Sequence, residues 1–155
     1  MIDLDGVAAH VRETVGERGS VSTLHDMVVI EVDREHLVDV ARIVRDDPVT
    51  RCDLYSVNAG VDLGDGELRS VTFVRGVETH VFVMLRTRCT ELDPHVPSLA
   101  PVWTGADWCE RETYDMFGIQ FDGHPDLRRV FLEESVPGHP LRKSFMPPRS
   151  DARGG

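Results

Sequence analysis

A cluster of acidic side chains lies between residues 110 and 115, where Glu110, Glu112 and Asp115 flank Arg111. Carboxylates this close together can act as general acids and bases, or can join a histidine in a metal site. The chain has neither a His–x₃₋₅–His spacing nor a Cys–x–x–Cys pair to support a metal site. Two interpretations of the cluster remain open: a small carboxylate-dependent metallo-enzyme, and an ion-paired helix face.

The segment that follows contains the tripeptide Gly-His-Pro twice, at residues 123–125 and 138–140. Each copy is followed by a leucine and two basic residues: Leu127, Arg128 and Arg129 after the first, and Leu141, Arg142 and Lys143 after the second. Glycine permits unusual turn angles, proline stiffens the extended chain, and arginine offers a planar fork to carboxylates. Such a segment has few residues with which to bury itself. We expect it to lie along a partner and to become ordered on binding.

A helix is expected to carry the acidic cluster. Thr104 is placed to cap its first amides, with Asp107 three residues later as in a capping box. Gly118 is placed to end the helix in a left-handed conformation. Within the helix, Arg111 and Asp115 are spaced as an i, i+4 ion pair.

The elements before this helix predict an α+β fold, with helices packed on a mixed or antiparallel sheet. Apolar residues at helical spacing predict a helix over 4–15, with Gly19 as a stop, and Asp33 is a plausible cap for a second helix that Pro48 ends. Strands are expected over 27–32 and 51–57, then a loop over 58–66. A hairpin of 68–75 and 79–88 completes the pattern.

Proline divides the chain sharply, since one of the nine prolines precedes residue 94 and the other eight lie at or after it. Because proline removes a backbone donor, little regular sheet is expected in the last third. The expected organisation is an α+β body over 1–93, a linker and docking helix over 94–118, and an extended Pro-rich C-terminal tail over 119–155.

The charge balance excludes some classes of partner. The chain has 17 Lys and Arg against 27 Asp and Glu, a net charge of −10. A protein that coats nucleic acid needs the opposite balance, so no nucleic acid partner is expected. No apolar run approaches the ~20 residues that a membrane span requires. The three cysteines are far apart, which is typical of free thiols in a reducing compartment.

The string ERETYDMFGIQFDGHPDLRR, followed by GHPLRK, resembles the family of the C-type (30-kDa-type) subunit of proton-pumping NADH:quinone oxidoreductase, respiratory complex I. Residues 110–125 and 138–143 fit the family pattern position by position. The resemblance extends more weakly over nearly the whole chain. The departures around the motif leave open the equivalent subunit of a membrane-bound energy-converting hydrogenase or a related dehydrogenase complex.

The resemblance implies a non-catalytic structural and assembly subunit that holds no cofactor itself. Flavin (FMN), the iron–sulfur clusters and quinone would belong to partner subunits of a hetero-oligomer in the peripheral arm, on the cytoplasmic side of the cell membrane. The C-terminal extension would wrap the D-type quinone-site subunit, next to the subunit that holds the terminal cluster.

Carried over by position, three stretches would contact the partners. The docking helix and its exit would contribute Glu110, Arg111, Glu112, Asp115, Phe117 and Gly118. The first loop would contribute His124, Pro125, Arg128 and Arg129, and the end of the tail Gly138, His139, Pro140, Leu141, Arg142 and Lys143. Arginines 111, 128, 129 and 142 are expected to form desolvated charge pairs with the partner.

Overall fold

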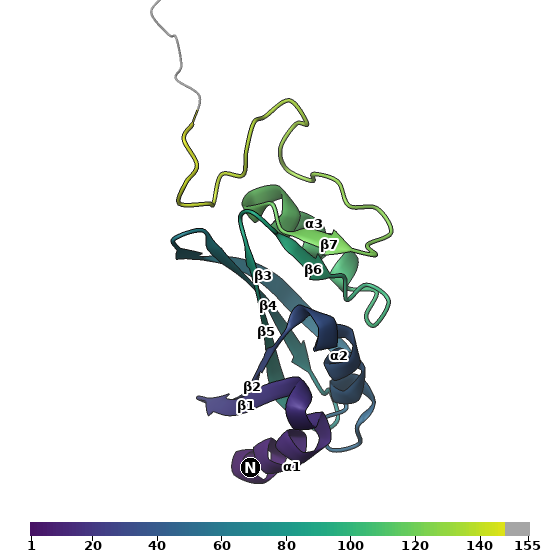
Figure 1. Cartoon of the computed structure of the whole chain (residues 1–155). Helices are drawn as coiled ribbons and strands as arrows, with labels where there is room; N and C mark the ends of the chain where they lie inside the picture. Colours follow the sequence, from purple (N-terminus) through teal and green to yellow (C-terminus); the bar gives the residue numbers. More distant parts are fainter. Residues whose placement is uncertain (148–155) are drawn as a thin grey trace, which may run out of the picture.

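The computed structural model describes residues 1–147 (Figure 1). A five-stranded sheet has the order β1-β2-β5-β4-β3, and a second, two-stranded ladder pairs β6 with β7. The helices are α1 (Leu4–Val15), α2 (Leu37–Asp46) and α3 (Ala106–Phe117). The strands are β1 (Gly19–Leu24), β2 (Met27–Val32), β3 (Leu54–Gly64), β4 (Glu67–Arg75), β5 (Phe82–Thr90), β6 (His95–Pro97) and β7 (Gln120–Asp122). The predicted α+β class is confirmed.

The first two helices form for the reasons that their sequences suggest. In α1, the Asp3 carboxylate accepts a hydrogen bond from the Gly6 amide at 3.1 Å, and Gly16 ends the helix with a positive φ of 60°. The predicted start of α2 is wrong: the Asp33 side chain accepts no capping hydrogen bond from the helix amides. A single 3₁₀ turn, Arg34–His36, precedes the helix instead. The helix ends before Pro48, since the residue ahead of a proline avoids helical angles.

The sheet is mixed, because β2 pairs with β5 in parallel and every other neighbour in this sheet is antiparallel. Strand β1 was not predicted, and Gly19 begins it rather than only ending a helix. The loop expected over 58–66 is also wrong. Strand β3 continues to Gly64, and Asp65 and Gly66 form a two-residue turn with φ of 52° and 80°. An Asp-Gly turn between strands is a strong hairpin signal, and the abundance of small and polar residues obscured it.

The helices and the sheet share one apolar core. Its buried members include Val11 of α1, Val40 of α2, Leu85 of β5 and Ala106 of α3. The core also contains Val96, Leu99, Ile119 and Phe121, so it continues across the boundaries expected at residues 94 and 119. The short strands β6 and β7 bring residues 95–97 beside residues 120–122 in parallel. They are the only strands after residue 94 in the described part of the chain, in agreement with the little regular sheet expected there.

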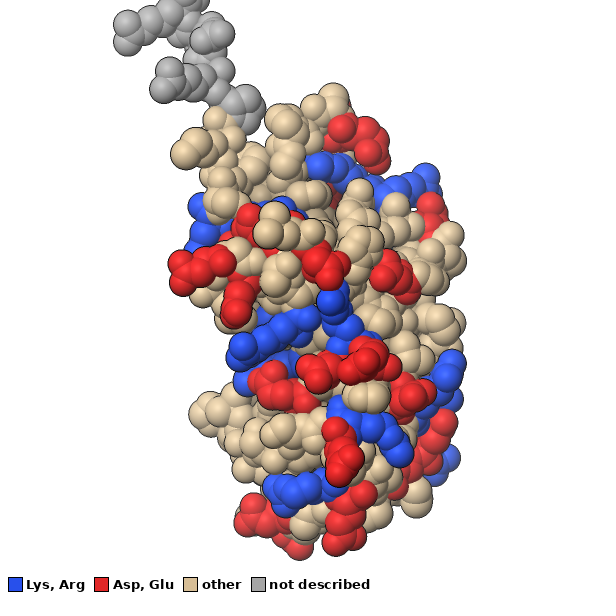
Figure 2. Space-filling view, viewed as in Figure 1, with Lys and Arg blue, Asp and Glu red and all other residues tan. Residues whose placement is uncertain are grey.

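The C-terminal part of the described chain, residues 123–147, runs in turns and extended pieces over α3 (Figure 1). Acidic and basic side chains are interspersed over the face seen in Figure 2. No helix within residues 1–147 has the length and apolar character needed to cross a membrane.

Candidate functional site

Helix α3 places the motif residues against the sheet. Its start differs from the prediction: Gly105 is the N-cap, and no side chain caps it. Its end agrees, because Gly118 is left-handed with φ 71° and its amide donates to Tyr114 O at 2.8 Å. The Phe117 ring packs on Gly60 of β3, where any Cβ would collide with it. The Thr113 hydroxyl donates to Asn58 Oδ1 at 2.6 Å.

Glu110 is buried, 1% exposed, and joins α3 to the segment after β6. Its two carboxylate oxygens accept hydrogen bonds at 2.6 Å from the Ser98 hydroxyl and from the Leu99 amide. Burial raises the pKa of Glu110 to about 7, although both hydrogen bonds act to lower it. The carboxyl is therefore committed to two structural bonds.

His124, from the first Gly-His-Pro, lies beside Glu110 with its side chain fully buried. Its Nδ1 accepts from the Asp126 amide at 3.0 Å, so Nε2 carries the proton in the neutral ring and donates to Asp107 O at 3.0 Å. Nε2 lies 4.0 Å from the nearer Glu110 oxygen. The histidine thus closes its own turn onto α3. Within residues 1–147 no three His, Cys, Asp or Glu side chains are grouped so as to hold a metal ion.

Asp115 is fully buried and receives the chain that follows β7. Its Oδ2 accepts hydrogen bonds from three consecutive amides, those of Val130, Phe131 and Leu132, at 3.2, 2.8 and 3.1 Å. Its Oδ1 lies 3.6 Å from Arg129 Nη1, and that guanidinium is also well buried. One carboxylate of the docking helix therefore anchors residues 129–132 of its own chain.

The predicted pair of Arg111 and Asp115 does not form. Arg111 lies over the Trp108 ring, 5.1 Å from its centroid, and its Nε donates to Arg128 O at 3.3 Å. Asp115 faces inward, where the amides of residues 130–132 already occupy it. Helical spacing brings the two positions within reach, but the Asp115 side chain is buried against residues 130–132 while the half-buried Arg111 lies over Trp108.

The second Gly-His-Pro motif covers the C-terminal end of α3. His139 Nδ1 donates to Asp115 O at 3.0 Å, and the Leu141 amide donates to Met116 O at 3.0 Å. Arg142 donates through Nε to Phe117 O and through Nη2 to Gly118 O. Donors at the carbonyl end of a helix satisfy orphan acceptors and complement the helix dipole. This arginine is thereby engaged within the chain.

Two polar residues that the sequence analysis did not single out hold the end of the tail. Asp62 of β3 accepts from the Lys143 amide at 2.7 Å, and Glu91, after β5, accepts from the Ser144 hydroxyl at 2.9 Å. Asp62 lies 81 positions from Lys143 in the sequence. No local spacing signals such a contact.

The sixteen predicted interface residues therefore divide by burial. Buried residues are Glu110, Asp115 and Gly118, and the His124 side chain is also buried; half-buried residues are Arg111, Glu112, Phe117, Arg129, His139, Pro140 and Arg142; exposed residues are Pro125, Arg128, Gly138, Leu141 and Lys143. The buried ones tie the chain to itself. The large apolar side chains left exposed around them are Trp108, Phe131, Leu141 and Met146.

Solved structures with this fold support the architecture. One chain of the membrane-bound sulfane sulfur reductase, an archaeal respiratory membrane complex, superposes with a TM-score of 0.77 at 20% identity, over 92% of this chain and 85% of that one. A trypsin-resistant fragment of Nqo5 superposes with a TM-score of 0.59 at 22% identity, over 81% of this chain and all of the fragment.

Sequence relatives extend the similarity. The C-type subunit of NADH-quinone oxidoreductase from Nocardia farcinica is 44% identical over 76% of this chain and 48% of its own length. Its counterpart from Streptomyces coelicolor is 41% identical over 87% of this chain and 52% of its own length. The chain thus spans about half the length of these relatives. Residues 30–151 match the family described as the 30-kDa subunit of respiratory-chain NADH dehydrogenase, and the chain belongs to that family.

Proposed function

We propose that the chain is a non-catalytic structural and assembly subunit in the peripheral arm of NADH:quinone oxidoreductase, where it supports electron transfer from NADH to quinone. Its relatives are named as the C-type subunit of that enzyme. In this proposal the body is a rigid support. Residues 123–147 form a strap, which together with α3 contacts the D-type quinone-site subunit and a cluster-bearing subunit. Flavin, iron–sulfur clusters and quinone stay with those partners, on the cytoplasmic side of the membrane.

The observation that carries the proposal is the contrast within the strap. The amides of residues 130–132 donate to Asp115 of α3, Arg129 lies 3.6 Å from the same carboxylate, and Arg142 donates to Phe117 O and Gly118 O. Three of the strap's large apolar side chains are instead exposed to solvent, with Phe131 62%, Leu141 54% and Met146 88% exposed. Exposed apolar groups held on an ordered extended segment are typical of a protein–protein contact.

The arrangement revises which arginines would meet the partner. Arg129 and Arg142 are engaged within the chain, whereas Arg128 is 65% exposed and paired only with Asp126 at 3.0 Å. Arg111, half-buried over Trp108, lies next to it. Among the four, Arg111 and Arg128 are therefore the ones we assign to the partner.

The direct test is a native pull-down from membranes with the tagged full chain, followed by mass spectrometry. We expect the flavin, cluster and quinone-site subunits to come with it. A nickel-site subunit in their place would move the chain to an energy-converting hydrogenase. Recovery of the chain alone from the soluble fraction would contradict both assignments. It would favour the alternative in which the isolated chain is itself an enzyme.

A sharper version uses Phe131→Ser and Leu141→Ser together. Both side chains are more than half exposed, so the isolated chain should melt as before while recovery of the partners falls at least tenfold. The matched control is Val77→Ser, an equally exposed apolar residue in the turn between β4 and β5. Equal recovery of partner subunits with the double variant and with the control would show that the strap does not contact them.

A further inference from the structure

The sheet has a second face that no helix within residues 1–147 covers. The buried apolar residues of α1, α2 and α3 all belong to the core on one side of the sheet. On the other side only a small cluster is buried, made by Val29, Val71 and Met84. The cross-strand register gives the remaining residues of this open face, because side chains of directly paired residues share a side.

The open face is apolar over most of its width. One cross-strand row contains Val57, Phe73, Met84 and Val29 and ends at Ser22 of β1. The adjacent row contains Leu54, Arg75, Phe82, Met27 and Leu24. Leu24, Leu54 and Val57 are each at least 40% exposed. An antiparallel sheet that faces water on one side normally alternates polar residues outward. The outward positions here break that alternation, which is the pattern of a sheet face that another element covers.

Arginines border this apolar region. The outward positions of the strands carry Arg69, Arg75, Arg86 and Arg88 against Glu31 and Glu67, so this face has an excess of two positive charges in a chain whose net charge is −10. Most acids of the chain therefore lie elsewhere. The face offers a positive edge beside an apolar centre.

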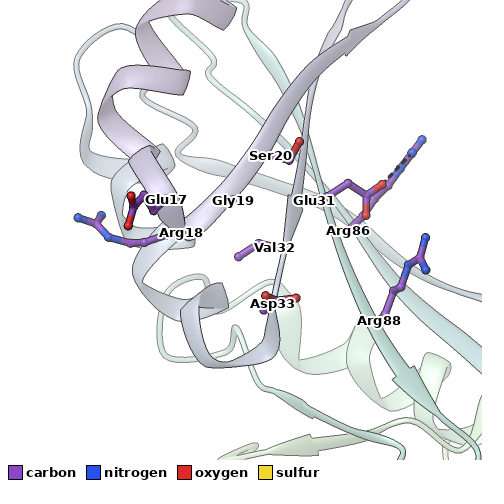
Figure 3. A pocket seen from close by; sticks show the side chains of 9 residues that line it. All are labelled: Glu17, Arg18, Gly19, Ser20, Glu31, Val32, Asp33, Arg86 and Arg88. Carbon is purple, nitrogen blue, oxygen red and sulfur yellow. Dashed lines mark hydrogen bonds and ion pairs between the residues drawn. The ribbon is translucent and has the colours of Figure 1, made fainter.

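The contacts of these arginines show that acceptors are scarce. Glu31 serves two of them, Arg86 at 3.2 Å and Arg69 at 3.8 Å. Arg69 is 15% exposed, and its Nε is buried with no acceptor among the described residues. Arg88 is 63% exposed and reaches only Glu67, at 3.8 Å. Figure 3 shows Glu31 turned to Arg86, with Arg88 extending separately. These residues line a hollow of about 570 Å³.

We propose that this open sheet face docks on a surface of a partner subunit that is apolar at its centre and carries carboxylates opposite Arg69, Arg86 and Arg88. The proposal rests on the proposed function, to which it adds a second contact surface besides the strap. The arginines stand on paired strands, so they are pre-organised to receive carboxylates.

Charge also argues against the two other occupants. In a symmetric pair of chains the same arginines would lie on both sides of the interface, so neither chain would offer carboxylates to the other. Two chains that each carry a net charge of −10 would also repel one another. Residues 148–155, Pro-Arg-Ser-Asp-Ala-Arg-Gly-Gly, offer no large apolar side chain and two further arginines. Neither supplies the apolar and acidic surface that the face requires.

The test places a photo-crosslinking amino acid at Val57 in the tagged full chain and isolates the complex from membranes. The control site is Glu13, which is exposed on α1 in the helix layer. We expect a cross-link from position 57 to a peptide of a partner subunit that contains Asp or Glu, and at least fivefold less cross-linking from position 13. A cross-link to a second copy of the chain, or to its own residues 148–155, would overturn the proposal.

Charge reversal tests the arginine edge. Arg88→Glu should lower recovery of the assembled complex at least fivefold without changing the melting temperature of the isolated chain, because Arg88 makes only one long ion pair. Arg42→Glu, the same change at an exposed position of α2, is the control. Replacing the cross-linked partner carboxylate by arginine should restore recovery of the Arg88→Glu complex.

The two proposals fail separately. If wild-type chain brings partner subunits down while position 57 cross-links nothing and Arg88→Glu is neutral, the sheet face is no interface and the proposed function stands. If wild-type chain brings no partner at all, the proposed function is wrong and the docking face is wrong with it.

Discussion

Two carboxylates of α3, five residues apart, are both buried but in different surroundings. Glu110 faces the body, with two donors, and burial raises its pKa to about 7. Asp115 faces the strap, with three amides and the Arg129 guanidinium around it. The difference teaches that two buried carboxylates of one helix can serve separate purposes. Burial favours the protonated form of Glu110, whereas Asp115 holds residues 130–132 through Oδ2 while its Oδ1 lies 3.6 Å from Arg129. The helix therefore has one pH-sensitive attachment and one ionic attachment.

The largest effect is expected from Asp115→Asn, which would break the ionic attachment. The amide removes the negative charge and leaves the Arg129 guanidinium, 9% exposed, beside a neutral group. Loss of one partner of a buried pair costs about 3–5 kcal/mol. Urea unfolding should show that loss, and hydrogen exchange should show faster exchange at the amides of residues 130–132.

The control for that variant is Asp126→Asn. Its carboxylate pairs with Arg128 at the surface, where ion pairs contribute about 0–1 kcal/mol. Equal destabilisation by the two variants would contradict the anchoring role of Asp115.

The second effect concerns pH and Glu110. Because its pKa rises from 4.5 to about 7 on folding, the folded chain retains a proton that the unfolded chain releases. Stability from this group is complete below pH 4.5 and is lost as pH rises through about 7. The shift corresponds to about 3 kcal/mol.

The measurement is unfolding at about pH 5 and about pH 8 for wild type and Glu110→Gln, on either side of the raised pKa. Wild type should lose stability at the higher pH, and the variant should lose much less, since glutamine does not titrate. Parallel pH profiles for the two proteins would show that the decline comes from other groups.

A smaller effect is expected at the end of α3. Gly118→Ala puts a Cβ at φ 71°, where it also meets the His139 ring and the Arg142 guanidinium. Gly123→Ala provides the matched control, because φ is 82° and the space around it is open. Left-handed angles cost a non-glycine residue about 1–2 kcal/mol, so both variants lose that much. Calorimetry should find a further loss only for Gly118→Ala, from displacement of the strap.

The smallest effect on stability is expected for Arg128→Ala. The side chain is 65% exposed, and its single ion pair is screened by solvent. Thermal melting should shift little, while recovery of partner subunits in the pull-down should fall. A large loss of stability would place Arg128 among the intrachain attachments with Arg129 and Arg142.

The sequence was sufficient to predict the helix that carries the motif, the left-handed glycine at its end and the α+β class of the body, with the sheet left as mixed or antiparallel. These rest on local signals, such as Gly118 and the apolar run of β2. It did not predict β1, because Ser20, Ser22 and Thr23 are polar and the strand exists through pairing with β2. Nor did it predict that Asp115 binds the amides of residues 130–132, since every residue except proline has such an amide.

The strap shows the same limit. Gly-His-Pro and the basic residues after it indicated a segment made to bind something, and an external partner was the expected site. The structure shows that much of this chemistry is internal, with His139 on Asp115 O and Arg142 on Phe117 O. A motif of this kind indicates that its side chains make specific contacts. Whether they bind the same chain or another depends on contacts between distant positions, as between Asp62 and Lys143.

The parallel pairing of β2 with β5 has a consequence for how the chain reaches this structure. Strands β1 and β2 form one hairpin, and β3, β4 and β5 form a meander whose contacts are local. Within the sheet the two units join along the ladder of β2 with β5, which begins where Met27 pairs with Phe82, across 54 intervening residues. Closing so long a loop delays that contact, so on a ribosome the hairpin must wait, unpaired along one edge, until synthesis passes residue 90.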